Sequence, residues 1–175
     1  MWLKLDLEGI SFEFRISEYE PSTNQNWDTN WCKVDLTIRS GNWLDYRIEY
    51  KEILLAAEVE NLRDGINKLL NDELNEPQLI EGLEPDLEFH LHPKEDKRNN
   101  PRISYVRLGY EIIDVDMQLI ITFWNIDKSL SENKMILCFN RDELEKLLCY
   151  LNLVTGVISE NDLKVKRYIN EGCLH

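Results

Sequence analysis

The chain has 175 residues, 43% of them hydrophobic, and its 33 acidic and 20 basic residues give a formal net charge of −13. A domain of this length buries enough surface to fold without a disulfide or a metal ion. Because such a charge repels nucleic-acid phosphates and anionic membranes, it argues against both as partners. It either attracts a basic protein or simply keeps the chain soluble, and both interpretations stay open.

Alternating apolar and polar residues predict a meander of antiparallel strands up to Tyr50. The start, MWLKLDLEGISF, alternates in this way and is expected to be a strand rather than an export signal. Further strands are expected at Ile10–Ile16, Trp31–Ser40 and Trp43–Tyr50. The alternation directs their charged residues to solvent, among them Asp35, Asp45 and Glu49, and it directs Tyr50 to the core.

Apolar residues at steps of three and four then predict a helix over Leu55–Leu69. Gly65 costs this helix about 1 kcal/mol relative to alanine, so it suggests a close approach to the sheet. Pro77 and Pro85 bracket a segment that is expected to be irregular.

The second half of the chain returns to strands. They are expected at 86–93, at 102–113, at 115–124 and at Met135–Phe139, with a charged loop at Lys94–Arg102. The last of these strands shows no clean alternation, which is typical of a central strand covered on both faces.

Two helices are expected near the C-terminus. Asn140 and Glu143 form a capping box for the first, its buried face is apolar, and Gly156 ends it. Ser159 and Asp162 indicate a shorter second helix that runs to about Ile169.

These elements predict one α+β domain over residues 1–175. The sheet is expected to be largely antiparallel, with seven to nine strands, curled or two-layered, and covered by two main helices plus the short C-terminal one. The residues expected in the core are Phe12, Phe14, Val34, Leu36, Ile38, Val59, Leu62, Ile66, Phe89, Leu119, Leu137, Leu144 and Leu148.

Three of the five tryptophans, Trp27, Trp31 and Trp43, lie in two polar turns and the strand between them. Alternation places Trp31 and Trp43 on the polar faces of their strands. Such side chains pack under a helix or pair across strands in most small β domains, and otherwise they anchor a partner. Both roles stay open for these two residues.

Glu88, His90 and His92 alternate along one strand and are expected to share its exposed face. A His-x-His pair can bind zinc, but no further ligands accompany it, so we interpret these residues as solvent-facing. Asp114 and Asp116 form a DxD, which holds a divalent ion in some enzymes and is also common in turns. We therefore expect no metal, cofactor or catalytic residue, and a metal-dependent hydrolase is the remaining enzyme hypothesis.

The four cysteines are far apart and show no CxxC spacing, which is typical of reduced thiols in a cytosolic protein. They are Cys32, Cys138, Cys149 and Cys173. None has a neighbour in the sequence that would activate it as a nucleophile.

Five segments follow one another in an order found in a known family. They are WDTNWCKV from Trp27, LLAAEVENL from Leu54, EPDLEF from Glu84, MQLIITF from Met117 and MILCFNRDELEKLL from Met135. Over about Leu5 to Thr155, the chain resembles the WapI-like immunity proteins, bacterial cytosolic proteins that neutralise polymorphic wall-associated toxins. Residues 94–102 and 156–175 have no counterpart in the family pattern, and Gly65-Ile66 stands where the family helix carries a tryptophan.

The resemblance implies a cytoplasmic, non-enzymatic protein that neutralises a toxin by direct binding. The charge agrees, because nuclease toxins are commonly basic and a negative surface is steered toward them. Candidate contact residues are Trp31, Trp43, Asp35, Asp45, Glu49 and Glu88. A structural or regulatory interaction module with an unknown partner is the alternative, and the sequence leaves the oligomeric state open.

Overall fold

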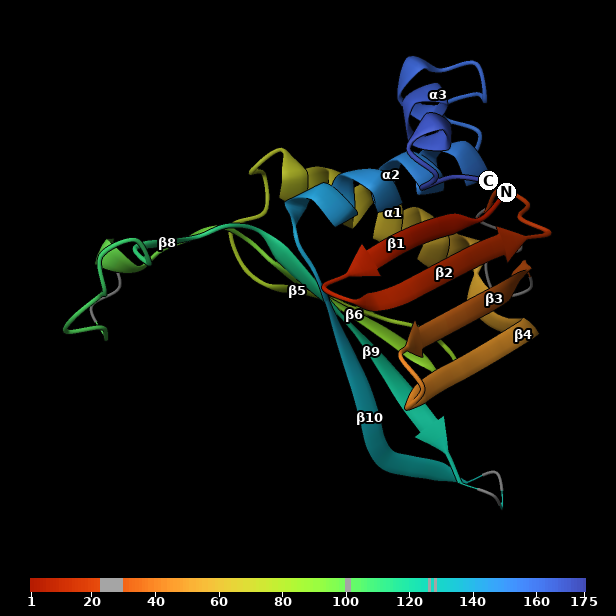
Figure 1. Cartoon of the computed structure of the whole chain (residues 1–175), viewed down its shortest axis with the longest axis horizontal. Coiled ribbons are helices and arrows are strands. Elements are labelled where there is room, and N and C mark those ends of the chain that lie inside the picture. The colour runs from red at the N-terminus through yellow and green to blue at the C-terminus, as the bar shows by residue number, and fades with distance from the viewer. Residues whose placement is uncertain (23–29, 100–101, 126, 128) are drawn as a thin grey trace.

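The computed structural model describes residues 1–22, 30–99, 102–125, 127 and 129–175 (Figure 1). In this part of the chain, ten strands form two four-stranded antiparallel sheets and one two-stranded sheet, and three α-helices accompany them. The predicted α+β class is confirmed, with one strand more than the upper limit of the expected range.

Sheet A consists of β1 (Leu3–Leu7), β2 (Ile10–Ser17), β3 (Trp31–Ser40) and β4 (Leu44–Leu55), each antiparallel to the next. Alternation gives this sheet an apolar inner face and a charged outer face. In β1, for example, Leu3, Leu5 and Leu7 are buried while Lys4 and Asp6 are exposed. The predicted N-terminal meander is therefore present.

A bulge interrupts the alternation of β4 opposite Asp35. The pairing of β3 with β4 shifts between Val34 and Leu36, so that two residues of β4 face one residue of β3. Tyr50 adopts a φ of +48° at this point, and its side chain is 54% exposed. The expectation that Tyr50 faces the core is wrong, because the extra residue reverses the direction of alternation.

Sheet B has the strand order β10–β9–β6–β5. Its strands are β5 (Gln78–Glu81), β6 (Leu87–His92), β9 (Asp116–Trp124) and β10 (Leu130–Phe139). Two expectations are corrected here: the segment between the two prolines contains the edge strand β5, and β10 is the opposite edge rather than a central strand. Ile136 of β10 is accordingly 55% exposed. Strand order depends on contacts distant in sequence, which local periodicity does not report.

Helix α1 (Ala56–Leu70) confirms the predicted helix and packs against β4, β5 and β6. Gly65 lies at the contact with sheet B, where an added Cβ would come within 2.7 Å of Leu91 Cδ1. Any added side chain would force Leu91 to shift, so the helix and the sheet approach closely here, as the sequence suggested.

Helix α2 (Arg141–Val154) begins with the predicted capping box at Asn140, and Gly156 follows it with a φ of +73°. Helix α3 (Leu163–Asn170) is capped by Asp162. Beyond α3, Leu174 is buried and forms a β-bridge with Leu3. The tail is therefore bound to the edge of sheet A.

The core lies between the two sheets and the helices α1 and α2. Phe12 of sheet A and Phe139 of sheet B meet edge to face, with ring centroids 5.2 Å apart. Every residue predicted for the core is buried except Leu148, which is half-buried. Sequence periodicity thus identified the core correctly at nearly every position.

Residues 93–114, termed the arm, connect β6 to β9 and project away from the body of the protein (Figure 1). The arm contains the short strands β7 (Glu95–Asp96) and β8 (Ile112–Ile113) and a 3-10 turn at Lys97–Asn99. The long strand predicted over 102–113 is therefore wrong. Within the described residues, this segment joins neither four-stranded sheet. Only its residues Ile112 and Ile113 pair with a strand, namely β7.

Candidate partner-binding surface

The outer face of sheet A carries charges of both signs at neighbouring positions. Its ion pairs join Lys4 to Glu13, Arg15 to Asp35, Lys33 to Glu52, and both Arg39 and Arg47 to Asp45. The strand register creates several of them, since oppositely charged residues stand directly across from one another. This face therefore neutralises most of its own charge.

Asp45 shows how strongly these carboxylates are engaged. The hydrogen bond from Arg47, 2.9 Å long, lowers the pKa of Asp45, and Arg39 adds to the effect. Glu49 on the same strand is exposed. Asp45 and Glu49 are the two acidic residues of β4 that are predicted as partner contacts. Of these, Asp45 already has cationic neighbours within the chain.

Asp35 has a structural position that the sequence did not reveal. It is only 7% exposed, so the expectation that it faces solvent is wrong. Its carboxylate accepts a hydrogen bond from Arg15 at 2.9 Å and another from the backbone N–H of Tyr50 at 3.0 Å. Because the second bond closes the β4 bulge, Asp35 holds the backbone geometry of sheet A.

The tryptophans do not form one surface cluster in the described part of the chain. Trp43 is 74% exposed at the turn between β3 and β4, and Trp31 is half-buried at the start of β3. Trp124 is 40% exposed and donates its Nε1–H to Asp86 at 3.0 Å. Trp27 lies outside the described residues. Trp43 is thus the predicted aromatic contact with a free side chain.

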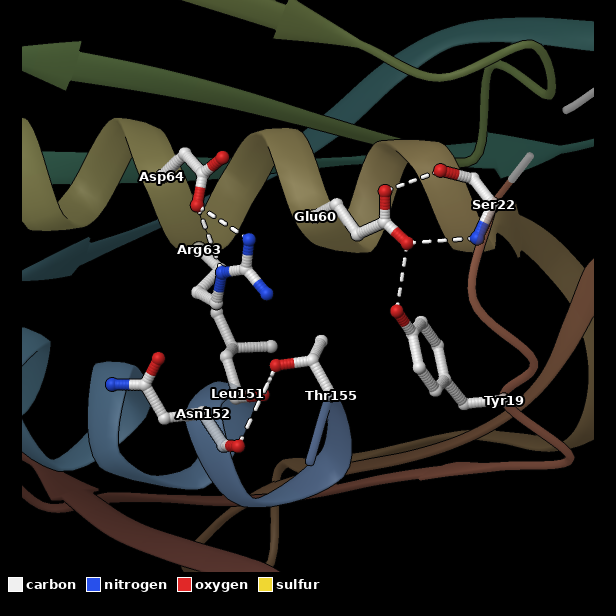
Figure 2. A network of polar contacts seen from close by, with 8 residues as sticks. All are labelled: Tyr19, Ser22, Glu60, Arg63, Asp64, Leu151, Asn152 and Thr155. Carbon is white, nitrogen blue, oxygen red and sulfur yellow. Dashed lines mark hydrogen bonds and ion pairs between the residues drawn. The ribbon is translucent and has the colours of Figure 1, made fainter. Parts of the chain in front are cut away.

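Glu60 of α1 fixes the chain segment that precedes residues 23–29. Figure 2 shows Tyr19 and Ser22 pointing toward its carboxylate, with the Tyr19 hydroxyl at 2.7 Å and the Ser22 backbone N–H at 2.8 Å. Burial alone would raise the pKa of Glu60, but the hydrogen bonds from Ser22 and Tyr19 outweigh it and lower the pKa. This carboxylate is therefore structural and is not free to meet a partner.

Glu88, His90 and His92 share one face of sheet B, as alternation predicted, but all three are half-buried rather than fully solvent-facing. Glu88 accepts a hydrogen bond from Lys134 at 2.7 Å, which lowers its pKa, and His90 lies 3.5 Å from the same carboxylate. His92 Nδ1 lies 2.5 Å from Asp116. These are pairwise contacts, and no group of three or more His, Cys, Asp or Glu in the described residues is placed to hold a metal ion.

One pocket beside the C-terminal tail and the pKa values of three cysteines bear on the question of a catalytic site. A pocket of about 590 Å³ lies between the β1–β2 turn and the C-terminal tail, lined by charges of both signs such as Lys4, Asp6 and Glu171. Burial raises the pKa of Cys32 to about 12, and burial also raises the pKa of Cys138 and Cys149. A raised pKa keeps a thiol protonated at neutral pH and so suppresses its nucleophilicity.

The acidic excess gathers instead along one edge of sheet B. Residues 69–93 contain seven carboxylates and no Lys or Arg, which accounts for more than half of the net charge. Two of the seven are neutralised within the fold: Asp86 by Lys51 at 2.6 Å, and Glu88 by Lys134. Five remain around strand β5.

These five carboxylates, Asp72, Glu73, Glu76, Glu81 and Glu84, are termed the acidic edge together with β5. Asp72 has Arg141 at 3.8 Å, whereas the other four form no ion pair with a Lys or Arg in the described part of the chain. Leu79 and Leu83, at 48% and 62% exposure, add apolar surface between them. An apolar centre with an acidic rim suits a basic protein surface.

Helix α1 positions one end of the acidic edge. The carboxylate of Glu58 accepts hydrogen bonds from the backbone N–H of Leu83 at 2.6 Å and of Leu55 at 2.9 Å. Burial raises the pKa of Glu58, and these two bonds oppose the rise. The loop after β5 is therefore tied to the core, which makes the edge a preformed surface.

The sequence contained a signal for the acidic edge, namely the run of acidic residues without a basic one. The predicted contact set of Trp31, Trp43, Asp35, Asp45, Glu49 and Glu88 does not include this run, because it rests mainly on strand alternation. Alternation identifies solvent-facing positions but does not identify which carboxylates have cationic neighbours.

The Immunity protein WapI-like family matches residues 3–154, which cover most of the chain. A search among curated proteins finds no match. Among the described residues, no helix is long and apolar enough to cross a membrane.

Proposed function

The chain belongs to the Immunity protein WapI-like family, and we propose that it neutralises a cognate toxin in the cytoplasm by binding it directly, without catalysis. Family membership supplies the class of partner. The charge distribution, which the match does not describe, supplies the surface and the chemistry of recognition.

We place the contact at the acidic edge and infer a basic toxin domain as the partner. The observation that carries this proposal is the group of four carboxylates, Glu73, Glu76, Glu81 and Glu84, without an ion-pair partner in the described residues. Their field extends over about 8 Å at physiological ionic strength, so they attract a basic surface before contact. Leu79 and Leu83 then contribute apolar area to the bound state.

Neutralisation follows from occupancy of the toxin surface. A toxin that acts on nucleic acid must hold phosphates with lysine and arginine side chains. The carboxylates of the acidic edge offer these same cations a competing set of ion pairs. Binding therefore excludes the substrate electrostatically and sterically, and it requires no reaction by the immunity protein.

Two residues predicted from the sequence, Trp43 and Glu49, retain free side chains and form the alternative contact surface to the acidic edge. Asp35, Asp45 and Glu88 are engaged with cations of the chain, so they are weaker candidates. Trp31 is half-buried and offers a partner only part of its surface.

Co-expression tests the proposed function. Each candidate toxin domain encoded near the gene for this chain is induced in a host that it kills, with and without this protein. We expect survival only with the protein, and a complex of the two that co-purifies. If cells die equally in both cases with every neighbouring toxin, the chain is instead a structural or regulatory interaction module.

A further inference from the structure

The arm exposes several large apolar side chains. Its uncovered side chains include Tyr105 at 80%, Leu108 at 88%, Tyr110 at 59%, Ile112 at 48% and Ile113 at 38%. Single exposed apolar residues are common on proteins, but a group this dense on a projecting element marks an interaction site. The arm therefore has the composition of a surface that another protein covers.

The charge of the arm is opposite to that of the rest of the chain. Residues 93–114 contain five basic and four acidic residues, in a protein with a net charge of −13. Lys97 and Arg107 form no ion pair in the described part of the chain, and the Arg107 guanidinium stacks on Tyr110 at 5.4 Å from the ring centroid. The arm thus combines aromatic rings with available cations.

These side chains surround a recess of about 390 Å³ on the arm. Its lining residues are Lys97, Ile103, Tyr105, Val106, Arg107 and Tyr110. An apolar recess with cations on its rim fits an apolar side chain that has carboxylates on either side.

The acidic edge presents that pattern. Leu83, in the loop after β5, is 62% exposed and lies between Glu81 and Glu84 in the sequence, and Leu79 is exposed on β5. No ion pair joins a cation of the arm to these carboxylates within the described chain, and the arm extends away from the body (Figure 1). The complementary surface is therefore available on a second copy of the protein.

We propose that the chain forms a twofold dimer in which the arm of each copy covers the acidic edge of the other. A twofold axis makes the two contacts identical, so the interface is closed and both recesses are filled. Salt screens the repulsion between two negatively charged bodies over about 8 Å, whereas the local contacts between arm and edge persist. The dimer does not rest on the proposed function; if both hold, toxin and second copy compete for the acidic edge.

Sedimentation velocity of the full chain over a range of concentrations tests this dimer. We expect a species with twice the chain mass of 20.8 kDa that dissociates on dilution. Two double variants, Lys97→Glu with Arg107→Glu on the arm and Glu81→Lys with Glu84→Lys on the edge, each place like charges at both contacts. The dissociation constant of the dimer should rise more than about tenfold in each.

Mixing the two variants gives the sharper result. In the mixed dimer, one contact joins the reversed arm to the reversed edge, and the other joins the original arm to the original edge. Attraction is restored at both, so the mixture should dimerise although neither variant does alone. As a control, Lys164→Glu with Lys166→Glu on α3 changes the net charge as much as the arm variant does and should leave the dimer intact.

Three results would overturn the proposal: a wild-type chain that stays monomeric at every concentration, a dimer that the arm variant does not weaken, or a mixture that stays monomeric. If the wild-type chain is monomeric and the arm variant instead loses affinity for the toxin, the arm contacts the toxin and the dimer is rejected.

Discussion

The outer face of sheet A and the acidic edge of sheet B both present many carboxylates, yet they differ in what surrounds them. On the outer face, cross-strand neighbours of opposite sign neutralise most acidic residues. Along the acidic edge, four carboxylates have no ion-pair partner in the described residues. The first region pairs most of its charge within the fold, and the second leaves its charge available for a partner.

This difference shows why a count of charges is a poor guide to a binding surface. Exposed ion pairs contribute little to stability, but each one also cancels the field that would attract a partner. What matters for recognition is the charge left after internal pairing. On that basis the acidic run at residues 69–93 is a stronger candidate for recognition than the larger outer face of sheet A.

The largest expected effect removes the support of both regions at once. Leu62 lies fully buried on α1, which packs against both sheets. Leu62→Ala should reduce the free energy of unfolding by about 2–5 kcal/mol, because it leaves a cavity. Urea unfolding measures the change. Leu163→Ala on α3 is the matched control, because Leu163 is 83% exposed. It should change the free energy of unfolding by no more than about 0.5 kcal/mol.

The next effect separates a structural carboxylate from a recognition carboxylate. Asp35→Ala removes the partner of Arg15 and leaves the Tyr50 N–H without its acceptor. The free energy of unfolding should fall by about 1–3 kcal/mol, while the rate of association with the toxin stays unchanged. Asp45→Ala on the same face should leave the stability nearly unchanged, because exposed ion pairs contribute little. A slower association for Asp35→Ala would contradict this separation.

A smaller effect depends on pH. The hydrogen bond from Lys134 lowers the folded-state pKa of Glu88 below its unfolded value. The stabilisation is therefore present above the unfolded pKa of about 4.3 and is lost as the pH falls through the folded pKa. Glu88→Gln should be less stable than the wild type at neutral pH, and the difference should shrink at acidic pH. Thermal unfolding across the pH range measures it, and a difference that grows on acidification would contradict the assignment.

The smallest expected effect concerns the edge itself. Glu81→Gln with Glu84→Gln breaks no ion pair and relieves repulsion among neighbouring acids. Stability should therefore change by about 0.5 kcal/mol or less, toward a more stable protein. A marked loss of stability in urea unfolding would show that these carboxylates support the fold after all.

Sequence periodicity predicted the α+β class, the core and all three helices, because those features depend on local spacing and capping. Gly65 and the Asn140 capping box were identified for the same reason. It failed where long-range contacts decide: the β4 bulge exposes Tyr50, and strand order places β10 at an edge. The strand predicted over 102–113 failed for another reason, since its alternating residues join neither four-stranded sheet.

The candidate surface was less predictable than the fold. Alternation selected Asp35 and Asp45 as solvent-facing, but the ion pairs that occupy them arise from the register of β2, β3 and β4. Register cannot be read from one strand alone. The acidic run at 69–93 was visible in the sequence, although its place on an edge strand was not.

The central claim is that the acidic edge, rather than the outer face of sheet A, recruits the toxin. Its most direct test compares two double reversals with equal change in net charge: Glu81→Lys with Glu84→Lys on the edge, and Asp45→Lys with Glu49→Lys on β4. The association rate constant with the toxin domain is measured at low salt, at concentrations where the chain is monomeric. The edge variant should associate about tenfold or more slowly than the wild type, and the β4 variant should lose far less. Equal slowing by both variants would show that net charge alone drives association and would contradict the claim.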